Sequence, residues 1–582
     1  MTIFDILALV GGLAMFLFGM NYMGNSLERL GGGKFESILE KMTNNPIKGV
    51  LLGAGVTAVI QSSSAVTVMT VGFVNSGIMS LRQVTGIIMG SNIGTTITSW
   101  ILSLTGIESS NIFVSMLKPT SFTPILGLIG IGLHMMSKSE KKKEVGSILL
   151  GFAVLMFGMD AMSDAVAPLK DVPEFTSILT MFSNPILGVL AGALLTAVMQ
   201  SSSASVGILQ ALTVTGSITV GAAFPIILGQ NIGTCVTAII SSIGTSKNAK
   251  RTAGIHLSFN ILGVICAMLV FYGANAIIGL PFVNETANET TIAIIHTCFN
   301  VFATLVLFPF SKQIEKFACL IIRDKNEEAP QALIDERFIT SPSYAIDKVK
   351  EQCDDMANLA KENISLCLEF VKLYSSENDA KIRENEKKLA TFEDELETYL
   401  VKISSMHLGI NDSVKLSKLT HAIGNFERIG DYGVNILKTK RRMHEAKIHF
   451  SDDANRELEV MSRAVSEIVS NSVNAFINDD IELAMLVEPL EQVIDNLKVE
   501  LRARHSKRLQ SEQCSVENGM LFFDIINSFE RIADHCSNLA VCIIELSQRS
   551  YQTHSYLKDI KKNGNQSFMK AFEEYLHKYT VR

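Results

Sequence analysis

The sequence Gln61-Ser62-Ser63-Ser64-Ala65 occurs a second time, unchanged, as Gln200-Ser201-Ser202-Ser203-Ala204. A further pair keeps the same spacing, since Asn92-Ile93-Gly94-Thr95 returns as Asn231-Ile232-Gly233-Thr234. In both pairs the second copy lies 139 residues after the first (200 − 61 and 231 − 92). Chance does not produce two ungapped matches at one offset, so the first half of the chain is predicted to be an internal duplication.

Long apolar stretches surround these motifs and predict a polytopic membrane protein. Because about 20 apolar residues span a bilayer, we expect seven crossings, at residues 3–26, 83–104, 122–136, 145–165, 220–243, 255–272 and 293–310. Residues 46–78 differ, because two short apolar arms flank the Gln-Ser-Ser-Ser motif. Such arms predict a re-entrant hairpin with polar backbone at its tip. Three crossings per repeat, an odd number, would invert the second repeat relative to the first.

The predicted fold class is all-α, with two inverted membrane repeats followed by a soluble bundle of two three-helix units. The soluble part is indicated by dense charge and helical spacing of apolar residues after Lys312. The expected divisions are repeat one at 1–139, repeat two at 140–280, an extra crossing with an amphipathic stretch at 281–323, a linker at 324–343, the soluble domain at 344–548 and a tail at 549–582 with a helix near 567–579.

The distribution of positive charge predicts the orientation in a cell (inner) membrane. Lys and Arg residues concentrate in 28–48, at Arg82, in 137–144, in 245–251 and after 311. Cytoplasmic segments carry such an excess. The sequence therefore predicts an N-terminus outside the cell and a cytoplasmic C-terminal domain.

The duplicated motifs lie in stretches without ionisable side chains. Residues 49–81, 83–107 and 175–246 contain no Asp, Glu, Lys, Arg or His. Two polar tips that meet in mid-membrane are typical of a secondary transporter's substrate site. Helix N-termini, hydroxyls and amides favour a tetrahedral anion such as phosphate. The candidate binding residues are Gln61, Ser62, Ser63, Ser64, Gln200, Ser201, Ser202 and Ser203.

An anion held in these stretches needs a balancing charge, and no basic side chain supplies it. A proton would need a titratable carrier, whereas Na+ needs only carbonyl, amide and hydroxyl oxygens at unwound helix points. We assign sodium coordination, with substrate contact as a competing role, to Ser91, Asn92, Thr95, Thr96, Gln230, Asn231 and Thr234. The alternative is that these small and polar residues allow close helix packing and hold no ligand.

With its duplicated Gln-Ser-Ser-Ser signature, the region up to about residue 310 resembles the type II sodium/phosphate cotransporter family. The resemblance implies that both motifs line phosphate and sodium sites, with alternating access across the repeat interface. Its partners would then be inorganic phosphate, Na+ and the lipid bilayer. Import is expected only from the direction of the sodium gradient, and a phosphate exporter and a phosphate-binding membrane sensor remain alternatives.

A second duplication lies in the soluble half. Phe426-Glu427-Arg428-Ile429-Gly430-Asp431 returns as Phe529-Glu530-Arg531-Ile532-Ala533-Asp534, 103 residues later (529 − 426). Carboxylates four apart share one helix face, so we expect Glu427, Asp431, Glu530 and Asp534 to converge on a divalent or ferric metal between the two three-helix units. A solvated helix face is the alternative. These motifs resemble those of the PhoU family, which implies a metal-binding regulator of phosphate uptake.

Other function classes find little support. The net charge of −7 provides no basic footprint for nucleic acid. Nine cysteines without a C-x-x-C pair argue against a disulfide framework or a zinc ribbon. A membrane serine hydrolase would need a base near the serines, and none lies in the flanking segments, so we expect no enzyme. A homo-oligomer and a phosphate-regulatory protein partner are both compatible with the sequence.

Overall fold

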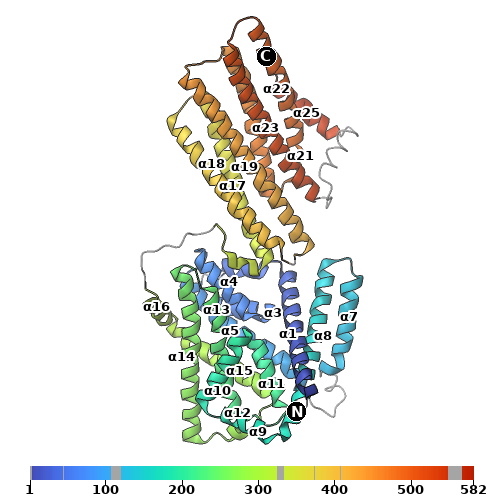
Figure 1. Ribbon diagram of the computed structural model, residues 1–582, viewed down its shortest axis with the longest axis vertical. Helices are drawn as coiled ribbons and strands as arrows, with labels where there is room; N and C mark the ends of the chain where they lie inside the picture. Colours follow the sequence, from blue (N-terminus) through green and yellow to red (C-terminus); the bar gives the residue numbers. More distant parts are fainter. Residues whose placement is uncertain are drawn as a thin grey trace. The chain divides into compact units, whose positions relative to one another are not determined.

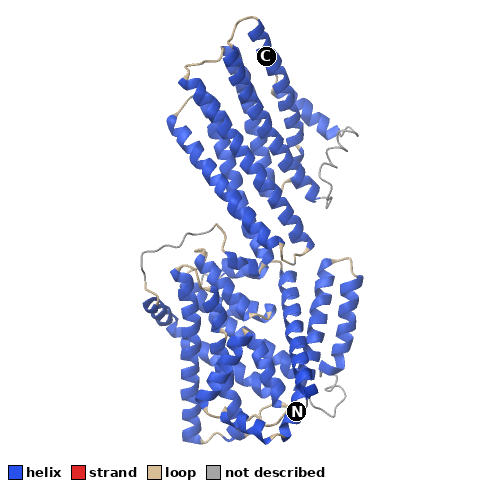
Figure 2. Ribbon diagram, in the orientation of Figure 1, coloured by secondary structure: helices blue, strands red, loops and turns tan. Residues whose placement is uncertain are grey.

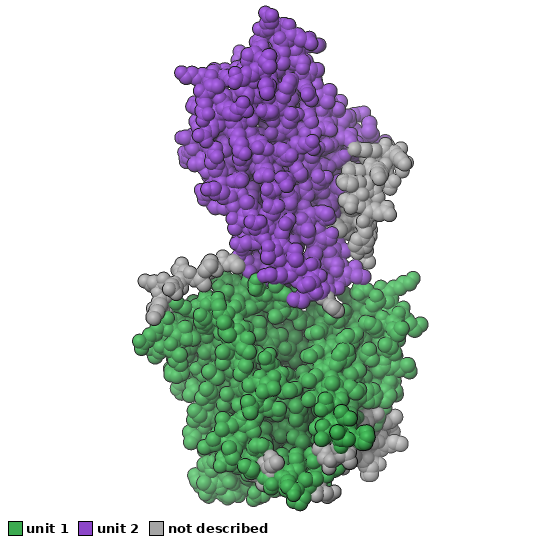
Figure 3. All heavy atoms as spheres, viewed as in Figure 1, with its two compact units in different colours: residues 1–331, 335–344 green, residues 332–334, 345–582 purple. Residues whose placement is uncertain are grey.

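The computed structural model describes residues 3–42, 45–106, 119–323, 333–372, 374–406, 408–547 and 566–581. In these residues the structure is helical, apart from one isolated bridge between Thr219 and Thr286 (Figure 2). The all-α prediction is confirmed. The chain divides into unit 1, residues 1–331 and 335–344, and unit 2, residues 332–334 and 345–582 (Figure 3). Residues 324–332 of the expected linker and 549–565 of the expected tail lie outside the described residues.

Unit 1 is built mainly from apolar helices (Figure 1). They are α1 (Ile3–Gly31), α2 (Lys34–Met42), α3 (Pro46–Ile60), α4 (Ser63–Asn75), α5 (Leu81–Ser103), α7 (Pro119–Met136), α8 (Glu140–Val166), α9 (Pro173–Met181), α10 (Pro185–Met199), α11 (Ser202–Thr213), α12 (Val220–Gly233), α13 (Cys235–Ser241), α14 (Lys247–Ile278), α15 (Glu289–Leu307) and α16 (Ser311–Ile321).

Six spans in the described part are long and apolar enough to cross a membrane. They are Ile3–Gly31, Leu81–Gly106, Glu140–Lys170, Val220–Ser241, Lys247–Ile278 and Glu289–Ile321. They coincide with six of the seven expected crossings. The remaining one corresponds to α7, whose apolar stretch is shorter than these spans. At about 1.5 Å of rise per residue, the 18 residues of α7 would reach roughly 27 Å. The seventh crossing therefore stays a prediction.

The path of the chain supports that seventh crossing. At one end of unit 1, Arg29 at the end of α1 bonds Glu144 at the start of α8 (3.0 Å). Asn75, the last residue of α4, accepts a hydrogen bond from the backbone N–H of Ser246, just before α14 (2.8 Å). The first contact ties together 28–48 and 137–144, two of the segments expected on the cytoplasmic side. If α5 and α8 both begin at the same end of unit 1, and α5 crosses the membrane, then α7 has to cross the membrane in the opposite direction.

The serine motifs interrupt two helix pairs at equivalent places. α3 ends at Ile60 and α4 begins at Ser63, and the same break separates α10 from α11 at the second motif. The two arms of each pair make little contact with each other. Instead, α3 packs along α5 and α10 packs along α12. The expected break is present, but each first arm is held by the helix that carries the Asn-Ile-Gly-Thr motif.

Close helix contact explains the glycines of that motif region. A Cβ atom on Gly90 would lie 1.9 Å from the carbonyl oxygen of Val50, and one on Gly229 would lie 2.0 Å from that of Val189. α5 continues unbroken from Leu81 to Ser103. The expectation of an unwound point is therefore wrong for repeat one, where these glycines allow backbone contact as in other membrane helices. In repeat two the helix is interrupted at Thr234, between α12 and α13.

Exposed apolar side chains cover the outer helices of unit 1. Phe4 on α1 is 76% exposed, Val198 on α10 is 73% exposed and Ile277 on α14 is 86% exposed. A water-soluble surface rarely carries so many large apolar side chains. A lipid environment for unit 1 follows, in agreement with the predicted multi-pass membrane protein.

Unit 2 is a helical bundle. Its helices are α17 (Pro342–Lys372), α18 (Ser376–Ser404), α19 (Ile410–Glu445), α20 (Asp452–Asn478), α21 (Ile481–Met485), α22 (Val487–Gln510), α23 (Val516–Ser547) and α25 (Gln566–Lys578). One core cluster joins α17, α18 and α19 through Cys367, Phe370, Ile382, Val434 and Leu437. α20, α22 and α23 pack on one another, and α19 packs along α23. The helix expected in the tail is α25, which packs against α22.

Candidate functional site

A cavity of about 250 Å³ in unit 1 lies where the two helix breaks meet. All eight residues of the duplicated motif line it, namely Gln61, Ser62, Ser63, Ser64, Gln200, Ser201, Ser202 and Ser203. Residues of α1 complete the wall, including Asn21, Asn25 and Glu28. The structure thus brings together two motifs that are 139 residues apart, as the sequence predicts.

Both tips share an unusual backbone. Gln61 has φ of 62° and Gln200 has φ of 53°, in the left-handed region that side chains other than glycine seldom adopt. The next residues cap the following helices, because Ser62 Oγ accepts the N–H of Ala65 and Ser201 Oγ accepts the N–H of Ala204, both at 3.2 Å. Strained backbone of this kind gathers at functional sites.

The capped helices direct donors at the cavity. The first N–H groups of a helix have no partner within it, and the N-termini of α4 and α11 begin at serines that line the cavity. Helix dipoles add partial positive charge there. The repeats also touch directly, because Ser64 Oγ donates to the carbonyl oxygen of Gln200 (3.4 Å). The arrangement favours a small anion.

One ionisable side chain lines this cavity, and it is an acid. Glu28 projects from α1, and the hydroxyl of Ser341 hydrogen-bonds to its carboxylate. No Lys or Arg is among the described lining residues. Glu28 lies outside the charge-free stretches of the sequence, so a titratable group reaches the site although those stretches contain none. Only the packing of α1 against the tips reveals it.

All seven predicted sodium ligands are buried, and none of them is among the described residues that line the cavity. They are Ser91, Asn92, Thr95, Thr96, Gln230, Asn231 and Thr234. Four of them bond carbonyl oxygens three or four residues earlier in their own helix, namely Thr95, Thr96, Asn231 and Thr234. These bonds satisfy the donors, as in the packing alternative, and they leave oxygen lone pairs on the same side chains.

Polar residues that the sequence analysis did not single out extend the same buried layer. Asn92 donates to Asn260 Oδ1 on α14 (2.9 Å). Ser99 shares a hydrogen bond with His296 Nδ1 on α15 (2.7 Å). Both partners are buried. The sequence contained a signal for Asn260 and His296, because a lone Asn or His in an apolar membrane helix costs free energy and therefore usually marks a functional position.

The two repeats differ in how they satisfy one pair of buried oxygens. In repeat one, Thr57 Oγ1 donates to Ser91 Oγ (2.8 Å). The residues 139 positions later are Thr196 and Gln230, and there Thr196 Oγ1 and Gln230 Oε1 have no hydrogen-bond partner. The Ser205 hydroxyl, beside Gln230, is also unpartnered. Such buried oxygens cost about 1–3 kcal/mol each unless a ligand completes them.

Unit 2 holds a compact carboxylate cluster on α22 and α23. Ligand oxygens of Glu491, Asp495 and Asp534 all lie within 4.8 Å of one another. Burial, then the charges of Glu530 and Asp495, raise the pKa of Asp534. Glu530 Oε1 bonds Lys498 (2.8 Å), and its Oε2 is buried without a hydrogen bond. These oxygens fit a hard cation.

The other copy of the motif lies in a separate acidic group on α18 and α19. Burial, then the neighbouring Asp431 and Glu393, raise the pKa of Glu427 to about 7. Glu427 Oε2 is buried without a hydrogen bond, like Glu530 Oε2. The expected convergence of Glu427, Asp431, Glu530 and Asp534 in one site is therefore wrong. Each motif pairs with acids from the preceding helix of its own bundle, because helices adjacent in the chain pack side by side.

Those additional acids had a sequence signal. Glu393 and Glu397 on α18, like Glu491 and Asp495 on α22, are four residues apart and so share a helix face. The same spacing marks the Phe-Glu-Arg-Ile motifs on the following helices. Two acidic faces on consecutive antiparallel helices indicate a cluster more strongly than one face alone.

Comparison with known proteins agrees with this geometry. Residues 15–164 and 171–307 match the family described as Na+/Pi-cotransporter, and residues 353–439 and 458–543 match the PhoU domain. The Escherichia coli (strain K12) protein named "Putative inorganic phosphate export protein YjbB" is 22% identical over 564 residues, 93% of this chain and 97% of that protein. The human protein named "Sodium-dependent phosphate transport protein 2B" is 36% identical over 132 residues, 21% of this chain and 19% of its own length.

Two further similarities cover only part of this chain. The Bacillus subtilis (strain 168) protein named "Uncharacterized protein YqeW" is 29% identical over 316 residues, 54% of this chain and 97% of that protein. The crystal structure of PhoU from Pseudomonas aeruginosa covers 35% of this chain and 98% of its own, with 19% identity and a TM-score of 0.34. The matched families are transporters and PhoU domains and not enzymes. With its paired serine tips and duplicated acidic motifs, this chain carries a Na+/Pi-cotransporter domain followed by two PhoU domains at its C-terminal end.

Proposed function

We propose that unit 1 moves inorganic phosphate across the cell membrane with Na+ as the coupling ion, and that the cavity between the serine tips is the substrate site. The observation that carries this proposal is the meeting of two capped helix N-termini at one polar cavity without a basic side chain. Helix N-termini bind phosphate through N–H groups and the helix dipole. Alternating access then moves the tips between two sides of the membrane.

The acid on the cavity supports coupling to a cation. A phosphate anion beside the Glu28 carboxylate would be repelled unless a positive charge enters with it. Na+ supplies that charge, and a proton on Glu28 is the competing possibility. The two differ in a measurable way, because a proton-coupled carrier keeps its flux when Na+ is replaced by choline.

The unpartnered oxygens of repeat two are the proposed sodium ligands. Thr196 Oγ1, Ser205 Oγ and Gln230 Oε1 come from α10, α11 and α12, and all three side chains are buried. Neutral oxygens from several helices suit Na+. Of the sodium ligands predicted from sequence, Gln230 is the one that this proposal retains.

Outward flow of phosphate is the proposed direction. The relatives named as phosphate export proteins in Escherichia coli (strain K12) and Salmonella typhimurium cover 93% and 95% of this chain. A phosphate anion that leaves a negative cell interior moves down the membrane potential, by about 2.3 kcal/mol per charge at 100 mV. Accompanying Na+ would move against it, so few Na+ ions per phosphate and high internal phosphate favour export.

For the topology we propose an N-terminus outside and unit 2 in the cytoplasm. Lys143 lies in the first turn of α8, next to Glu144, and Lys247 and Arg251 lie at the start of α14, in segments that the positive-inside rule assigns to the cytoplasm. Unit 2 would then regulate transport through a divalent or ferric ion at Glu491, Asp495 and Asp534.

Flux in proteoliposomes tests the proposal. The full chain is reconstituted, and labelled phosphate is followed in both directions with Na+ or choline. We expect saturable flux that requires Na+, and a loss of about tenfold or more when Ser63 and Ser202 become Ala, because these serines line the cavity without capping a helix. Ser177→Ala, on α9, is the control and should leave flux unchanged.

Three outcomes would contradict parts of this proposal. Unchanged flux in the serine variant would remove the motif from the substrate site. Equal flux in choline would replace sodium by another coupling ion. Phosphate binding without flux would make unit 1 a membrane sensor.

A further inference from the structure

The segment Asp335–Tyr344 belongs to unit 1, although it precedes the bundle of unit 2 in the chain. It contains a short 3-10 helix, η5 (Glu336–Thr340), and half of its ten residues are buried. Phe338 is 1% exposed and Ser341 is 2% exposed. A connecting segment normally lies on the surface and remains solvated, so burial of this kind indicates a specific docking site.

The aromatic ring of Phe338 packs against Gly72 and Phe73 of repeat one, and this packing site is called the Phe338 seat. The ring centroid lies 5.6 Å from that of Phe73 and 5.2 Å from that of Tyr344. Gly72 makes the seat possible, because a Cβ atom there would lie 2.9 Å from the Phe338 ring. Aromatic pairs in this range stabilise a contact beyond simple burial.

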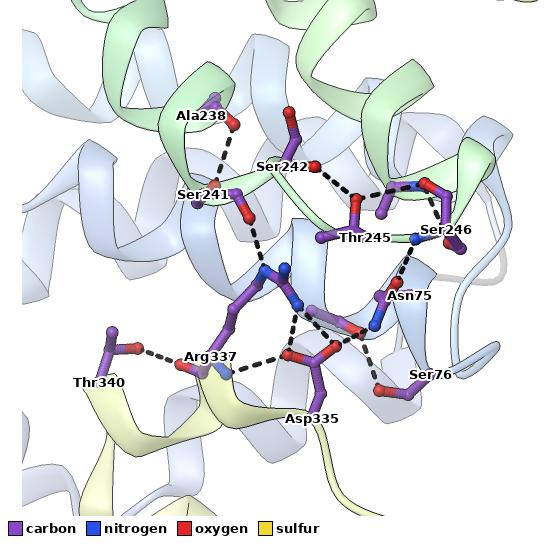
Figure 4. Close-up of polar contacts among 12 residues, drawn as sticks. Asn75, Ser76, Ala238, Ser241, Ser242, Thr245, Ser246, Asp335, Arg337 and Thr340 are labelled. Atoms are coloured by element: carbon purple, nitrogen blue, oxygen red, sulfur yellow. Dashed lines mark hydrogen bonds and ion pairs between the residues drawn. The ribbon is translucent and has the colours of Figure 1, made fainter. Parts of the chain in front are cut away.

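Polar bonds then fasten the segment to both repeats (Figure 4). Asn75, at the end of α4, donates to Asp335 and accepts from the N–H of Ser246 before α14 (2.8 Å). Arg337 pairs with Asp335 (2.8 Å) and donates from Nε to the carbonyl oxygen of Ser241 at the end of α13 (2.7 Å). Asp335 and Arg337 therefore join the end of α4 in repeat one to the α13–α14 turn in repeat two.

The duplication shows that this seat is specific to repeat one. The residues 139 positions after Gly72, Phe73 and Asn75 are Ala211, Leu212 and Val214. None of these provides the space, the ring or the amide that the segment uses. The tips that line the cavity are identical between repeats, so the difference at the end of α4 is not explained by substrate binding.

The same segment also closes part of the substrate cavity. Thr340 lines the cavity together with the serine tips. The hydroxyl of Ser341 hydrogen-bonds to Glu28, which lines it too, and to Glu36 on α2. The Tyr344 hydroxyl donates to Glu40 (3.0 Å). Movement of one repeat against the other would have to break these contacts before the cavity opens on this side.

We propose that Asp335–Tyr344 is a latch that holds the cavity of unit 1 closed on the side where the chain leaves for unit 2, and that unit 2 controls its release. The latch deepens the proposed transport function, on which its role in flux rests. Control by unit 2 follows from covalent continuity, because α17 begins at Pro342 within the latch and runs to Lys372. A change in the ligand state of the helical bundle can thereby act on the latch.

Accessibility of the latch can be measured without transport. In the full chain, Ser341→Cys, at a latch position that is only 2% exposed, is labelled with a membrane-impermeant maleimide, and the labelled peptide is quantified by mass spectrometry. Gly72→Ala should push Phe338 from its seat, and Arg337→Gln should remove the bond to Ser241 and the pair with Asp335. Each should raise the labelling rate about tenfold, the effect of one charge-assisted hydrogen bond. Ala211→Gly, at the repeat-two position equivalent to Gly72, is the control.

Labelling and flux separate this inference from the proposed function. Faster labelling of Ser341→Cys in both variants, with phosphate flux raised in proteoliposomes, supports the latch. Faster labelling in protein that carries no phosphate flux at all also supports the latch and overturns the transport proposal. Labelling rates equal to those of the parent in both variants would overturn the latch, whatever the flux.

Discussion

The two repeats of unit 1 agree at their tips and differ in the layers around them. Gln61 and Gln200 share the left-handed backbone, and Ser62 and Ser201 form the same cap at the same distance. Away from the tips, repeat one bonds Thr57 to Ser91, whereas repeat two leaves the oxygens at Thr196 and Gln230 without partners. The two repeats have the same geometry where both line one cavity, and they differ in the buried side chains away from it.

The largest expected effect on phosphate flux comes from changing the backbone conformation at the tips. Gln200→Gly keeps the positive φ without cost, whereas a β-branched residue there is strained by about 1–3 kcal/mol. We expect phosphate flux in Gln200→Val to fall roughly tenfold or more below that of Gln200→Gly. The corresponding Val and Gly variants at Gln61 should show the same ratio of phosphate fluxes. Equal fluxes in the two Gln61 variants would contradict the equivalence of the tips.

The buried hydroxyls of Thr57 and Thr196 test whether the two repeats differ in sodium binding. Thr196→Val removes a hydroxyl that has no partner, so the folded protein should lose no stability while its apparent Na+ affinity in flux assays falls about tenfold. Thr57→Val instead removes a buried hydrogen bond, so it should lower the unfolding temperature and leave the Na+ dependence nearly unchanged. Equal Na+ affinities for Thr196→Val and the parent would remove Thr196 from the sodium site.

The acidic motifs of unit 2 extend the comparison to a second duplication. The carboxylate oxygens of Glu491, Asp495 and Asp534 meet within 4.8 Å, so Asp495→Asn should weaken Mn²⁺ binding to the full chain about tenfold by calorimetry. Glu393→Gln in the other copy should weaken it less. Equal losses would show two equivalent metal sites.

Proton binding at Glu427 gives a pH dependence with a definite sign. Its pKa is raised to about 7 in the folded chain, so its contribution to stability is present below its unfolded pKa and is lost as pH rises through 7. A cation has to displace that proton, so Mn²⁺-induced stabilisation against heat should grow between pH 6 and pH 8. The growth should be smaller in Glu427→Gln, and an unchanged profile would contradict a metal near Glu427.

The smallest expected effect concerns the caps. Ser62→Ala and Ser201→Ala should each cost about 1 kcal/mol, because each hydroxyl caps one helix N-terminus. The two losses should be similar, since both bonds are 3.2 Å. Thermal unfolding of the two variants, with Ser→Asn replacements that restore a cap as controls, measures this. Unequal losses would show that the tips differ in packing despite their shared geometry.

Several features of the site were predictable from the sequence, and others were not. The serine motifs predicted one cavity, because duplication at a constant offset implies a matched pair of tips. The glycines near Asn92 were misassigned, since a glycine that unwinds a helix and one that allows helix contact look alike in a sequence. Glu28 was missed because its distance from the tips depends on how α1 packs.

What the sequence determined by itself is local and repetitive: helices, helix breaks, the absence of charge within the segments that carry the tips, and two duplications. These follow from hydropathy, periodicity and caps, which act over a few residues. The tertiary structure decided which oxygens of repeat two lack partners, which acids of unit 2 meet, and where Asp335 and Phe338 dock. Those outcomes depend on packing between residues far apart in the chain, where small differences in side-chain size select one contact over another.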